Sequence, residues 1–331
     1  MRKRIMKAVG ALLALCIFCL LFWSCGYGNA DKMDREEEVQ YIIGVSQANM
    51  REEWRVALIE ELKRETKAYE NIQIITTDAT ASVKKQKQDI DHLLGFGIDL
   101  LIISPCDEKE MTDKIKQVYD SNIPVIVMDR AIEGFDYTLY IGPDNEVIGQ
   151  QAGNYIAGML SGREGTVLEL RGNPMPIQSE ERSIGFQHVM ESHPEIAREV
   201  LQLDSESKDA AYDAIMGAKE ELQDVDVIFA HSDYIALGAY EALKNMGLED
   251  KVSIVGSDGF KGEDEGIDLV MSKRIKATIS CPIGGKEAIE YALSILNKES
   301  GVPKQVILRS YTITNENAQQ YLDKMNASYE D

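Results

Sequence analysis

From Tyr41 onward, short apolar runs alternate with longer amphipathic stretches, and this alternation constrains the fold more than any other feature of the sequence. The runs have the length of typical strands. The stretches between them place apolar residues at helical spacing, as Val56, Ile59 and Leu62 do. A strand–helix–strand repeat of this kind predicts right-handed crossovers and a parallel sheet covered by helices on both faces.

The alternation occurs twice in succession, which predicts two lobes of similar size. Strands are expected at 41–46, 72–77, 100–103, 124–128 and 138–141, and then at 166–170, 199–203, 227–230, 253–256 and 276–279. Helices are expected near 52–68, 82–95 and 108–120, and then near 145–160, 180–192, 208–222, 233–246 and 284–297. No Pro/Gly-rich linker divides the halves. The predicted fold class is therefore α/β, with two doubly wound parallel-sheet lobes and short hinge segments between them.

The first 24 residues are typical of a leader for export. Four cations lie among the first seven residues, and the uncharged apolar run Val9–Trp23 follows them. This run is short for a stable membrane span, which makes an uncleaved anchor helix the less favoured alternative. We therefore expect a signal peptide at 1–24 and a body that lies outside the cytoplasmic membrane.

The residues after the leader indicate a lipid anchor. Ser24-Cys25-Gly26 resembles the end of a bacterial lipobox, although Phe22 stands where leucine is usual. Cys25 would then be lipidated after cleavage. The polar segment 25–39 would form a tether between the anchor and the body.

Charge and cysteine content exclude several other classes of protein. A formal net charge of −21 argues against nucleic-acid binding, which needs clustered cations. Only Cys106 and Cys281 lie outside the leader and its cleavage site, which is too few for a disulfide framework, and whether the two pair is left open. No ligand spacing for a metal occurs, so no metal or cofactor is expected.

Polar residues follow most of the predicted strands. In open parallel sheets, ligands bind beyond the carboxyl ends of the strands. The residues at these ends include Ser46, Gln47, Asn49, Ser104, Asp129, Arg130, Arg171, His231, Ser232, Asp233 and Asp258. Carboxylates and guanidinium groups together suit a polyol, whose hydroxyls both donate and accept, and Trp54 could cover an apolar sugar face.

Each of these residues also has a purely structural interpretation. Asp129 and Arg130 could form an ion pair at the edge of a lobe. Asp233 is expected to cap a helix rather than to bind a ligand. On chemistry alone, Asp258 fits either role.

Nine segments, in order along the chain, carry a resemblance to a known family. They are Gly44–Gln47, Trp54-Arg55, Ile103–Pro105, Ile123–Arg130, Asp144-Asn145, Glu181–Phe186, Ala230–Asp233, Val255–Gly259 and Ala277–Ile279. From about residue 38 to residue 321, the chain resembles the ribose- and galactofuranose-type sugar-binding proteins of bacterial ABC transporters, which have the periplasmic binding protein type I fold.

The resemblance implies a three-segment hinge near 142–143, 281–282 and 308–310. The hinge would divide the body into an N-terminal lobe of residues 40–142 plus 283–309 and a C-terminal lobe of residues 143–281 plus 310–331. No catalytic residue is implied.

The resemblance also implies roles for residues of the site. Asp129 and Arg130 would grip sugar hydroxyls from the N-terminal lobe, and Arg182 and Asp258 from the C-terminal lobe. The remaining members of the expected ligand-binding set are Ser46 and Gln47 on the floor, Trp54 and Arg55 over the ligand, and Ser104, Ser232 and Cys281.

Three departures from the family pattern bear on the ligand. Ser232 stands where asparagine is usual, Cys281 stands where ribose-type members have glutamine, and no aromatic residue follows the strand at 199–203. Whether a second aromatic wall is present is therefore left open. Three arginines against two or three carboxylates also allow an acidic sugar.

The function expected is capture of a monosaccharide or related polyol by lobe closure, by a monomer that delivers it to an ABC permease. The alternative is a sugar-sensing receptor that signals to a membrane histidine kinase. An enzyme is disfavoured: arginines beside Asp129 and Asp258 would lower the pKa of a carboxylate that acid catalysis needs raised, and no Walker loop, nucleophile elbow or dinucleotide motif occurs. A repressor of the same fold is excluded by the leader, which stands where DNA-binding helices would be.

Overall fold

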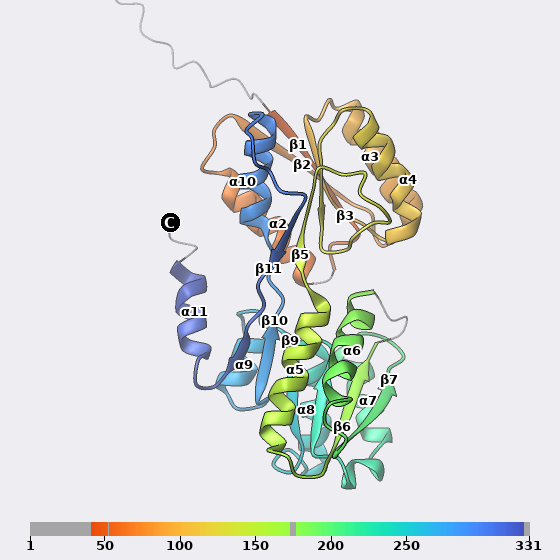
Figure 1. Cartoon of the computed structure of the whole chain (residues 1–331), viewed down its shortest axis with the longest axis vertical. Helices are drawn as coiled ribbons and strands as arrows, with labels where there is room; N and C mark the ends of the chain where they lie inside the picture. Colours follow the sequence, from red (N-terminus) through yellow and green to blue (C-terminus); the bar gives the residue numbers. More distant parts are fainter. Residues whose placement is uncertain (1–40, 52, 173–176, 328–331) are drawn as a thin grey trace, which may run out of the picture. The chain divides into compact units, whose positions relative to one another are not determined.

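The computed structural model describes residues 41–51, 53–172 and 177–327, and this part of the chain contains two six-stranded sheets (Figure 1). The predicted signal peptide at 1–24, the lipidation site Cys25 and the tether at 25–39 lie outside the described residues. None of the described helices combines the length and the apolar character that a membrane span requires.

The first sheet is entirely parallel and has the strand order β11-β5-β4-β3-β1-β2. Its strands are β1 (Tyr41–Gln47), β2 (Ile72–Asp78), β3 (Leu100–Ser104), β4 (Val125–Met128), β5 (Leu139–Pro143) and β11 (Gln305–Leu308). The helices beside it are α2 (Glu53–Thr66), α3 (Val83–Gly95), α4 (Glu108–Asp120) and α10 (Gly285–Leu296).

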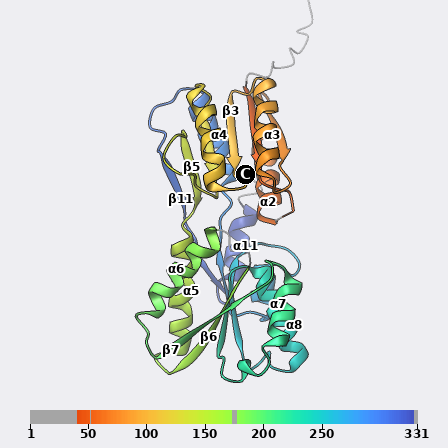
Figure 2. The same cartoon turned by 90° about the vertical axis from the view of Figure 1, so that its right-hand side faces the viewer.

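Each face of this sheet packs against its own layer of helices, so strand residues belong to two separate hydrophobic cores. On β3, Leu100 and Ile102 pack with residues of α2 and α10, whereas Leu101 and Ile103 pack with residues of α3 and α4. This is the two-residue alternation expected of a strand covered on both sides. Figure 2 shows α3 and α4 over one face of the sheet.

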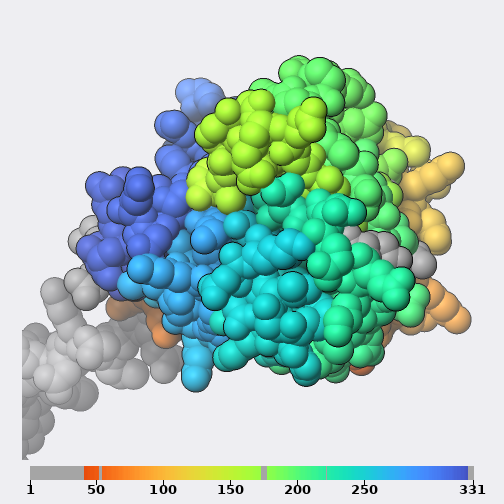
Figure 3. All heavy atoms as spheres, turned by 90° about the horizontal axis from the view of Figure 1, so that it is seen from below, coloured from red at the N-terminus to blue at the C-terminus, as the bar shows by residue number. Residues whose placement is uncertain are grey.

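The second sheet has the order β12-β10-β9-β8-β6-β7 and is parallel except for β12, which runs antiparallel to β10. Its strands are β6 (Gly165–Arg171), β7 (Ile196–Gln202), β8 (Val227–Ala230), β9 (Ser253–Asp258), β10 (Ala277–Ser280) and β12 (Thr312–Thr314). The helices around it are α5 (Asn145–Leu160), α6 (Ile177–Met190), α7 (Lys208–Gly217), the short 3-10 helix η1 (Glu221–Gln223), α8 (Asp233–Met246), α9 (Gly266–Met271) and α11 (Ala318–Ala327). Seen from below, α5 lies against the green and teal segments that follow it along the chain (Figure 3).

Helices α5 and α6 approach so closely that only glycine fits between them. A Cβ atom on Gly149 would lie 1.9 Å from the carbonyl oxygen of Arg182, and one on Gly185 would lie 2.0 Å from that of Glu146. This backbone contact fixes the position of Arg182 relative to α5.

Three segments connect the two sheets, which confirms the predicted fold class. The chain passes from β5 to α5, from β10 to α10 and from β11 to β12. The exact lobe bounds, 40–142 plus 283–309 and 143–281 plus 310–331, stay a prediction.

The sequence did not predict four of the elements, namely β11, β12, α9 and α11. The two strands lie at sheet edges and have only four and three residues, and Ile307 of β11 is 53% exposed, so neither gives an apolar run. The predicted helix at 208–222 ends at Gly217 and is followed by η1. The strand predicted at 199–203 spans 196–202 instead.

Candidate ligand-binding site

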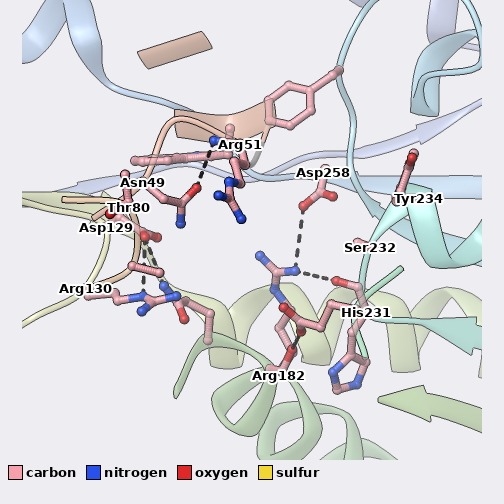
Figure 4. A pocket seen from close by; sticks show the side chains of 16 residues that line it. Asn49, Arg51, Thr80, Asp129, Arg130, Arg182, His231, Ser232, Tyr234 and Asp258 are labelled. Carbon is pink, nitrogen blue, oxygen red and sulfur yellow. Dashed lines mark hydrogen bonds and ion pairs between the residues drawn. The ribbon is translucent and has the colours of Figure 1, made fainter. Parts of the chain in front are cut away.

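A cavity of about 520 Å³ lies where the strands of both sheets end (Figure 4). Residues that follow β1, β2 and β4 line it together with residues of α6 and residues that follow β7, β8 and β9. The full lining is Asn49, Arg51, Trp54, Thr80, Ala81, Asp129, Arg130, Gln178, Ser179, Arg182, Glu206, His231, Ser232, Tyr234, Asp258 and Phe260. The carboxyl edges of the two parallel sheets therefore supply the walls, as expected of open α/β sheets.

The structure places the eleven predicted site residues in two layers. Those that line the cavity are Trp54, Asp129, Arg130, Arg182, Ser232 and Asp258. Those that are buried and do not line it are Ser46, Gln47, Arg55, Ser104 and Cys281, each at most 5% exposed. Of the second group, Arg55 and Cys281 contact the lining residues Asp129 and Arg182, and Ser104 holds Arg55. The side-chain polar atoms of Ser46 and Gln47 have no hydrogen-bond partner among the described residues. The role of all eleven in ligand binding stays a prediction.

Asp129 is the carboxylate that lines the cavity on the side of the first sheet. It follows β4 with a φ of +66°, a conformation that is uncommon for a residue with a side chain. The hydroxyl of Tyr140 donates to its carbonyl oxygen over 2.8 Å. Its Oδ2 lies 3.7 Å from Nη2 of Arg55 and 4.0 Å from Nε of Arg130, so two guanidinium groups hold the carboxylate in place.

The residues behind Asp129 fix its cationic neighbours. The Nη1 group of Arg55 donates to the hydroxyl oxygen of Ser104, and both side chains are 1% exposed. The Nη1 group of Arg130 donates to the carbonyl oxygen of Cys106 over 3.0 Å. Arg55 is thus part of the support for the site, whereas Arg130 lies at its surface.

Arg182 is the corresponding anchor on the side of the second sheet. Its Nε donates to Oδ1 of Asn145 over 3.0 Å, its Nη1 to the carbonyl oxygen of His231 over 2.5 Å, and its Nη2 to Sγ of Cys281 over 3.5 Å. Its Nη1 lies 3.7 Å from Oδ1 of Asp258.

Because burial raises the pKa of Cys281 to about 12, this thiol stays protonated at neutral pH. No disulfide joins Cys281 to Cys106 in the described structure.

The prediction that Asp233 caps a helix is wrong, because Ser232 is the cap of α8. The Ser232 hydroxyl accepts from the backbone N–H of Ile235. Asp233 is instead the first residue of the helix and is 2% exposed. Its Oδ2 accepts from the N–H of Gly259 and from the hydroxyl of Thr278, so it ties α8 to the neighbouring strand ends. Burial, with the nearby charge of Asp258, raises the pKa of Asp233 well above its ordinary value.

A buried polar network lies directly behind His231. Glu169, in the middle of β6, has no exposed surface, and its Oε1 accepts from Nε2 of His231 over 2.8 Å. Its Oε2 accepts from Nε of Arg198 over 2.6 Å. Burial would raise the pKa of Glu169, but the hydrogen bonds from His231 and Arg198, together with the positive charge of Arg198, outweigh it and lower that pKa.

His231 is held in its neutral form by the same surroundings. Burial lowers the pKa of His231 more than Glu169 raises it, so we assign the proton to Nε2, which donates to Glu169. Its Nδ1 is buried and has no hydrogen-bond partner among the described residues. The sequence analysis did not identify this network, although a glutamate inside a predicted buried strand was a signal that it needs a partner.

Several lining residues were also not predicted, and two of them are aromatic. Phe260 and Tyr234 line the cavity in addition to Trp54, so aromatic side chains come from both halves of the chain. Phe260 could have been found from its place two residues after Asp258. Arg51, Gln178, Ser179 and Glu206 follow no recognised motif. Nowhere in the described ranges do three or more His, Cys, Asp or Glu side chains form a group that could hold a metal ion.

Comparisons with known proteins agree with this architecture. Residues 43–300 match the family described as the periplasmic binding protein domain. The chain is 27% identical over 300 residues to the ribose import binding protein RbsB of Bacillus subtilis, covering 88% of this chain and 93% of that protein. It is 30% identical over 235 residues to the protein of the same name in Escherichia coli, covering 68% of this chain and 75% of that protein.

Two solved structures are also similar to this chain. The fructose-binding periplasmic domain of a hybrid two-component system matches with a TM-score of 0.79 at 31% identity, over 88% of this chain and 98% of that domain. A solute-binding protein from Bacillus halodurans with bound myo-inositol matches with a TM-score of 0.77 at 21% identity, over 88% and 99% of the two chains.

Proposed function

The chain belongs to the periplasmic binding protein domain family, and from that premise we propose that it captures a monosaccharide or related polyol outside the cytoplasm and delivers it to an ABC permease. The curated relatives named above are import binding proteins for ribose. We extend that role to this chain because its similarity to the Bacillus subtilis protein covers 88% of its length.

The observation that carries the proposal is the mixture of acceptors and donors on opposite walls of one cavity. Asp129 and Arg130 follow a strand of the first sheet, and Asp258 and Arg182 belong to the half built on the second sheet (Figure 4). A sugar hydroxyl donates to a carboxylate and accepts from a guanidinium group, so each pair can satisfy hydroxyls of one ring. Trp54 and Phe260 add apolar surface for the faces of that ring.

Binding without catalysis is supported by the arginines that lie beside two of the lining carboxylates. General acid catalysis needs a carboxylic acid at the cavity surface with a raised pKa. Asp129 lies against Arg55 and Arg130, and Asp258 lies against Arg182. The strongly raised pKa belongs to Asp233, which is buried and does not line the cavity.

Capture by lobe closure is supported by a hydrogen bond between the two halves. Nε2 of Gln178, in α6, donates to Oδ2 of Asp129 over 2.9 Å. With three connecting segments as a hinge, closing would bring such groups together around a ligand and opening would separate them. The lobe bounds that we propose are 40–142 plus 283–309 and 143–281 plus 310–331, and each boundary lies at or beside one of these segments.

The proposed anchoring follows from the leader. We expect cleavage before Cys25, lipidation of its sulfur, and a monomer held outside the membrane by the tether at 25–39. Mass spectrometry of the protein extracted from membranes tests this: an acylated N-terminal Cys25 is expected, and an unprocessed N-terminus contradicts it. In the same measurement, the variant Cys25→Ala should give no lipidated protein.

Sensing is the second candidate, because the similar fructose-binding domain belongs to a two-component system. Deleting the gene distinguishes the two outputs. Transport predicts loss of uptake of the radiolabelled ligand, whereas sensing predicts retained uptake with loss of the transcriptional response to that ligand.

Tryptophan emission tests ligand capture itself. Trp54 is the one tryptophan after residue 24, and it lines the cavity. A sugar that binds should change the emission of the protein lacking its leader, and Asp129→Ala should abolish the change. A change that persists in Asp129→Ala contradicts the placement of the site. The variant Trp54→Phe is the control, since its emission should not respond.

A further inference from the structure

A second carboxylate, that of Asp233, lies next to Asp258 beneath the cavity surface. Asp258 lines the cavity and points toward Arg182, whereas Asp233 is 2% exposed and does not line it (Figure 4). The backbone N–H of Asp233, the first residue of α8, donates to Oδ2 of Asp258 over 3.4 Å. This contact ties Asp258 to the start of α8, yet the proposed capture of a sugar assigns no part to Asp233.

The packing around Asp233 leaves one of its carboxylate oxygens suited to a proton. A Cβ atom on Gly256 would lie 2.2 Å from Oδ1, and one on Gly266 would lie 1.9 Å from Oδ2, so the group is tightly enclosed. Two hydrogen bonds from described residues reach the carboxylate, and both end on Oδ2, from the N–H of Gly259 over 2.7 Å and from the hydroxyl of Thr278 over 2.8 Å. Oδ1 is buried and has no hydrogen-bond partner among the described residues. A buried charged oxygen without a donor is costly, so Oδ1 is the atom that a proton would occupy.

The acidic groups that face Asp233 favour the same protonated form. Asp258 brings a negative charge from β9, and Glu265 brings another from the position before α9, whereas β10 has no charged residue. Burial and the charge of Asp258 raise the pKa of Asp233 well above its ordinary value. Other acids near α9 pair with a cation of their own, namely Asp264 and Asp268 with Arg274.

The cations on the neighbouring elements make contacts elsewhere. Nη1 of Arg182, in α6, lies 3.7 Å from Oδ1 of Asp258. Lys261, in the segment after β9, donates to a side chain of α11 over 3.1 Å. His231, just before α8, is neutral because burial lowers its pKa. Asp233 is thus left facing charges of its own sign.

A sugar bound at Asp258 would change the surroundings of this pair of carboxylates. A hydroxyl that donates to Asp258 replaces a water molecule, and closure of the lobes keeps further water out. The charge of Asp258 is then less screened, so its repulsion of a charged Asp233 increases. The complex therefore favours the protonated form of Asp233 more strongly than the unliganded protein does.

We propose that Asp233 and Asp258 form a proton-linked pair, in which Asp233 positions Asp258 for a sugar hydroxyl and takes up a proton when the sugar binds. The inference rests on the proposed function and adds a regulation of the same cavity. Because the liganded protein binds more protons, the affinity is highest below the pKa of Asp233 in the unliganded protein. It decreases as the pH rises from that value to the higher pKa of Asp233 in the complex.

Isothermal titration calorimetry measures the proton directly. Ribose, fructose, galactose, glucose, myo-inositol and glucuronate are titrated into the protein between pH 6 and pH 9, each in pairs of buffers with different ionisation enthalpies. The difference in observed enthalpy between the buffers gives the protons taken up per sugar, which should lie above zero and reach at most one. Over this range the affinity should fall about 3- to 10-fold, which corresponds to a rise of about 0.5–1 in one pKa on binding.

Three variants assign the proton to Asp233. Asp233→Asn keeps an oxygen that accepts from Gly259 and Thr278 and places an uncharged NH2 group where Oδ1 stood, so it should abolish proton uptake and flatten the pH dependence. Asp233→Ala also removes these hydrogen bonds and should weaken binding about tenfold or more at every pH. Asp226→Asn, just before β8 and outside the cavity, is the matched control and should keep the uptake and the pH dependence. Melting temperatures without ligand show whether each variant folds.

Each other outcome is decisive. Binding without proton uptake, or with release of a proton, overturns the linkage and leaves sugar capture standing. Uptake that persists in Asp233→Asn belongs to another group and also overturns it. An affinity of Asp233→Ala equal to that of the wild type overturns the positioning of Asp258. No binding of any member of the panel overturns the proposed function and this inference with it.

Discussion

Replacing Glu169 by leucine should destabilise the protein by removing the support behind His231. Glu169 accepts from His231 and from Arg198, and it is completely buried in β6. Leucine has a similar size but accepts no hydrogen bond. The His231 imidazole, 1% exposed and without a partner at Nδ1 among the described residues, would then have no acceptor for its N–H.

The cost follows from the two lost hydrogen bonds. Leaving the buried His231 N–H unsatisfied costs about 1–3 kcal/mol. Arg198 is 20% exposed and keeps a hydrogen bond from Nη2 to the Ser183 hydroxyl, so its loss is smaller, about 1–2 kcal/mol. We expect the free energy of unfolding of Glu169→Leu to fall by the sum of the two losses, about 2–5 kcal/mol, which overlaps the range for breaking a buried charged pair.

Urea unfolding at pH 7 measures this loss, and Glu169→Gln is the matched control. Glutamine keeps an acceptor for Arg198, so it should lose roughly half as much. Because the His231 carbonyl oxygen accepts from Arg182, Glu169→Leu should also weaken ligand binding without touching the cavity. A loss under about 1 kcal/mol for Glu169→Leu, at an unchanged m-value, would refute the reasoning.

Two further predictions follow from the same half of the chain. Burial lowers the pKa of His231, so below the ordinary value of 6.5 the unfolded chain binds a proton that the native state does not. The free energy of unfolding should therefore decrease as the pH falls from 7 through 6.5 toward the lowered pKa. In urea titrations at several pH values, His231→Gln should show a shallower decrease, and an unchanged slope would contradict the assignment. Gly149→Ala should lower the melting temperature and cost about 1–3 kcal/mol or more, because its Cβ would lie 1.9 Å from the Arg182 carbonyl oxygen. Gly158→Ala, in the same helix with open space at its Cβ, should be neutral or stabilising, and equal effects of the two changes would argue against the close contact of α5 and α6.

The sequence predicted those parts of the fold that depend on local apolar pattern. All ten expected strands and all eight expected helices have counterparts in the structure, because each buried strand is a continuous apolar run and each helix has one apolar stripe. The edge strands β11 and β12 were not predicted, since their residues are partly exposed and their pairing depends on distant partners.

The site was predicted as far as residues follow strand ends directly. Asp129, Arg130, Ser232 and Asp258 were found in this way, and all four line the cavity. Whether Arg55 lines the cavity or lies behind it depends on side-chain packing, which no motif records. Gln178 and Glu206 come from loops and helix starts whose position is set by tertiary contacts, so their spacing along the chain carried no signal.

Thermal unfolding with a panel of pentoses, hexoses, polyols and uronic acids tests the central claim most directly. A ligand at 100 times its Kd stabilises the native state by about 2.7 kcal/mol, which corresponds to a rise in Tm of about 4 °C for a chain of this size. The account predicts such a rise for at least one member of the panel, and its loss in Asp129→Ala. A Tm that no member of the panel changes, or a rise that survives in Asp129→Ala, would contradict it.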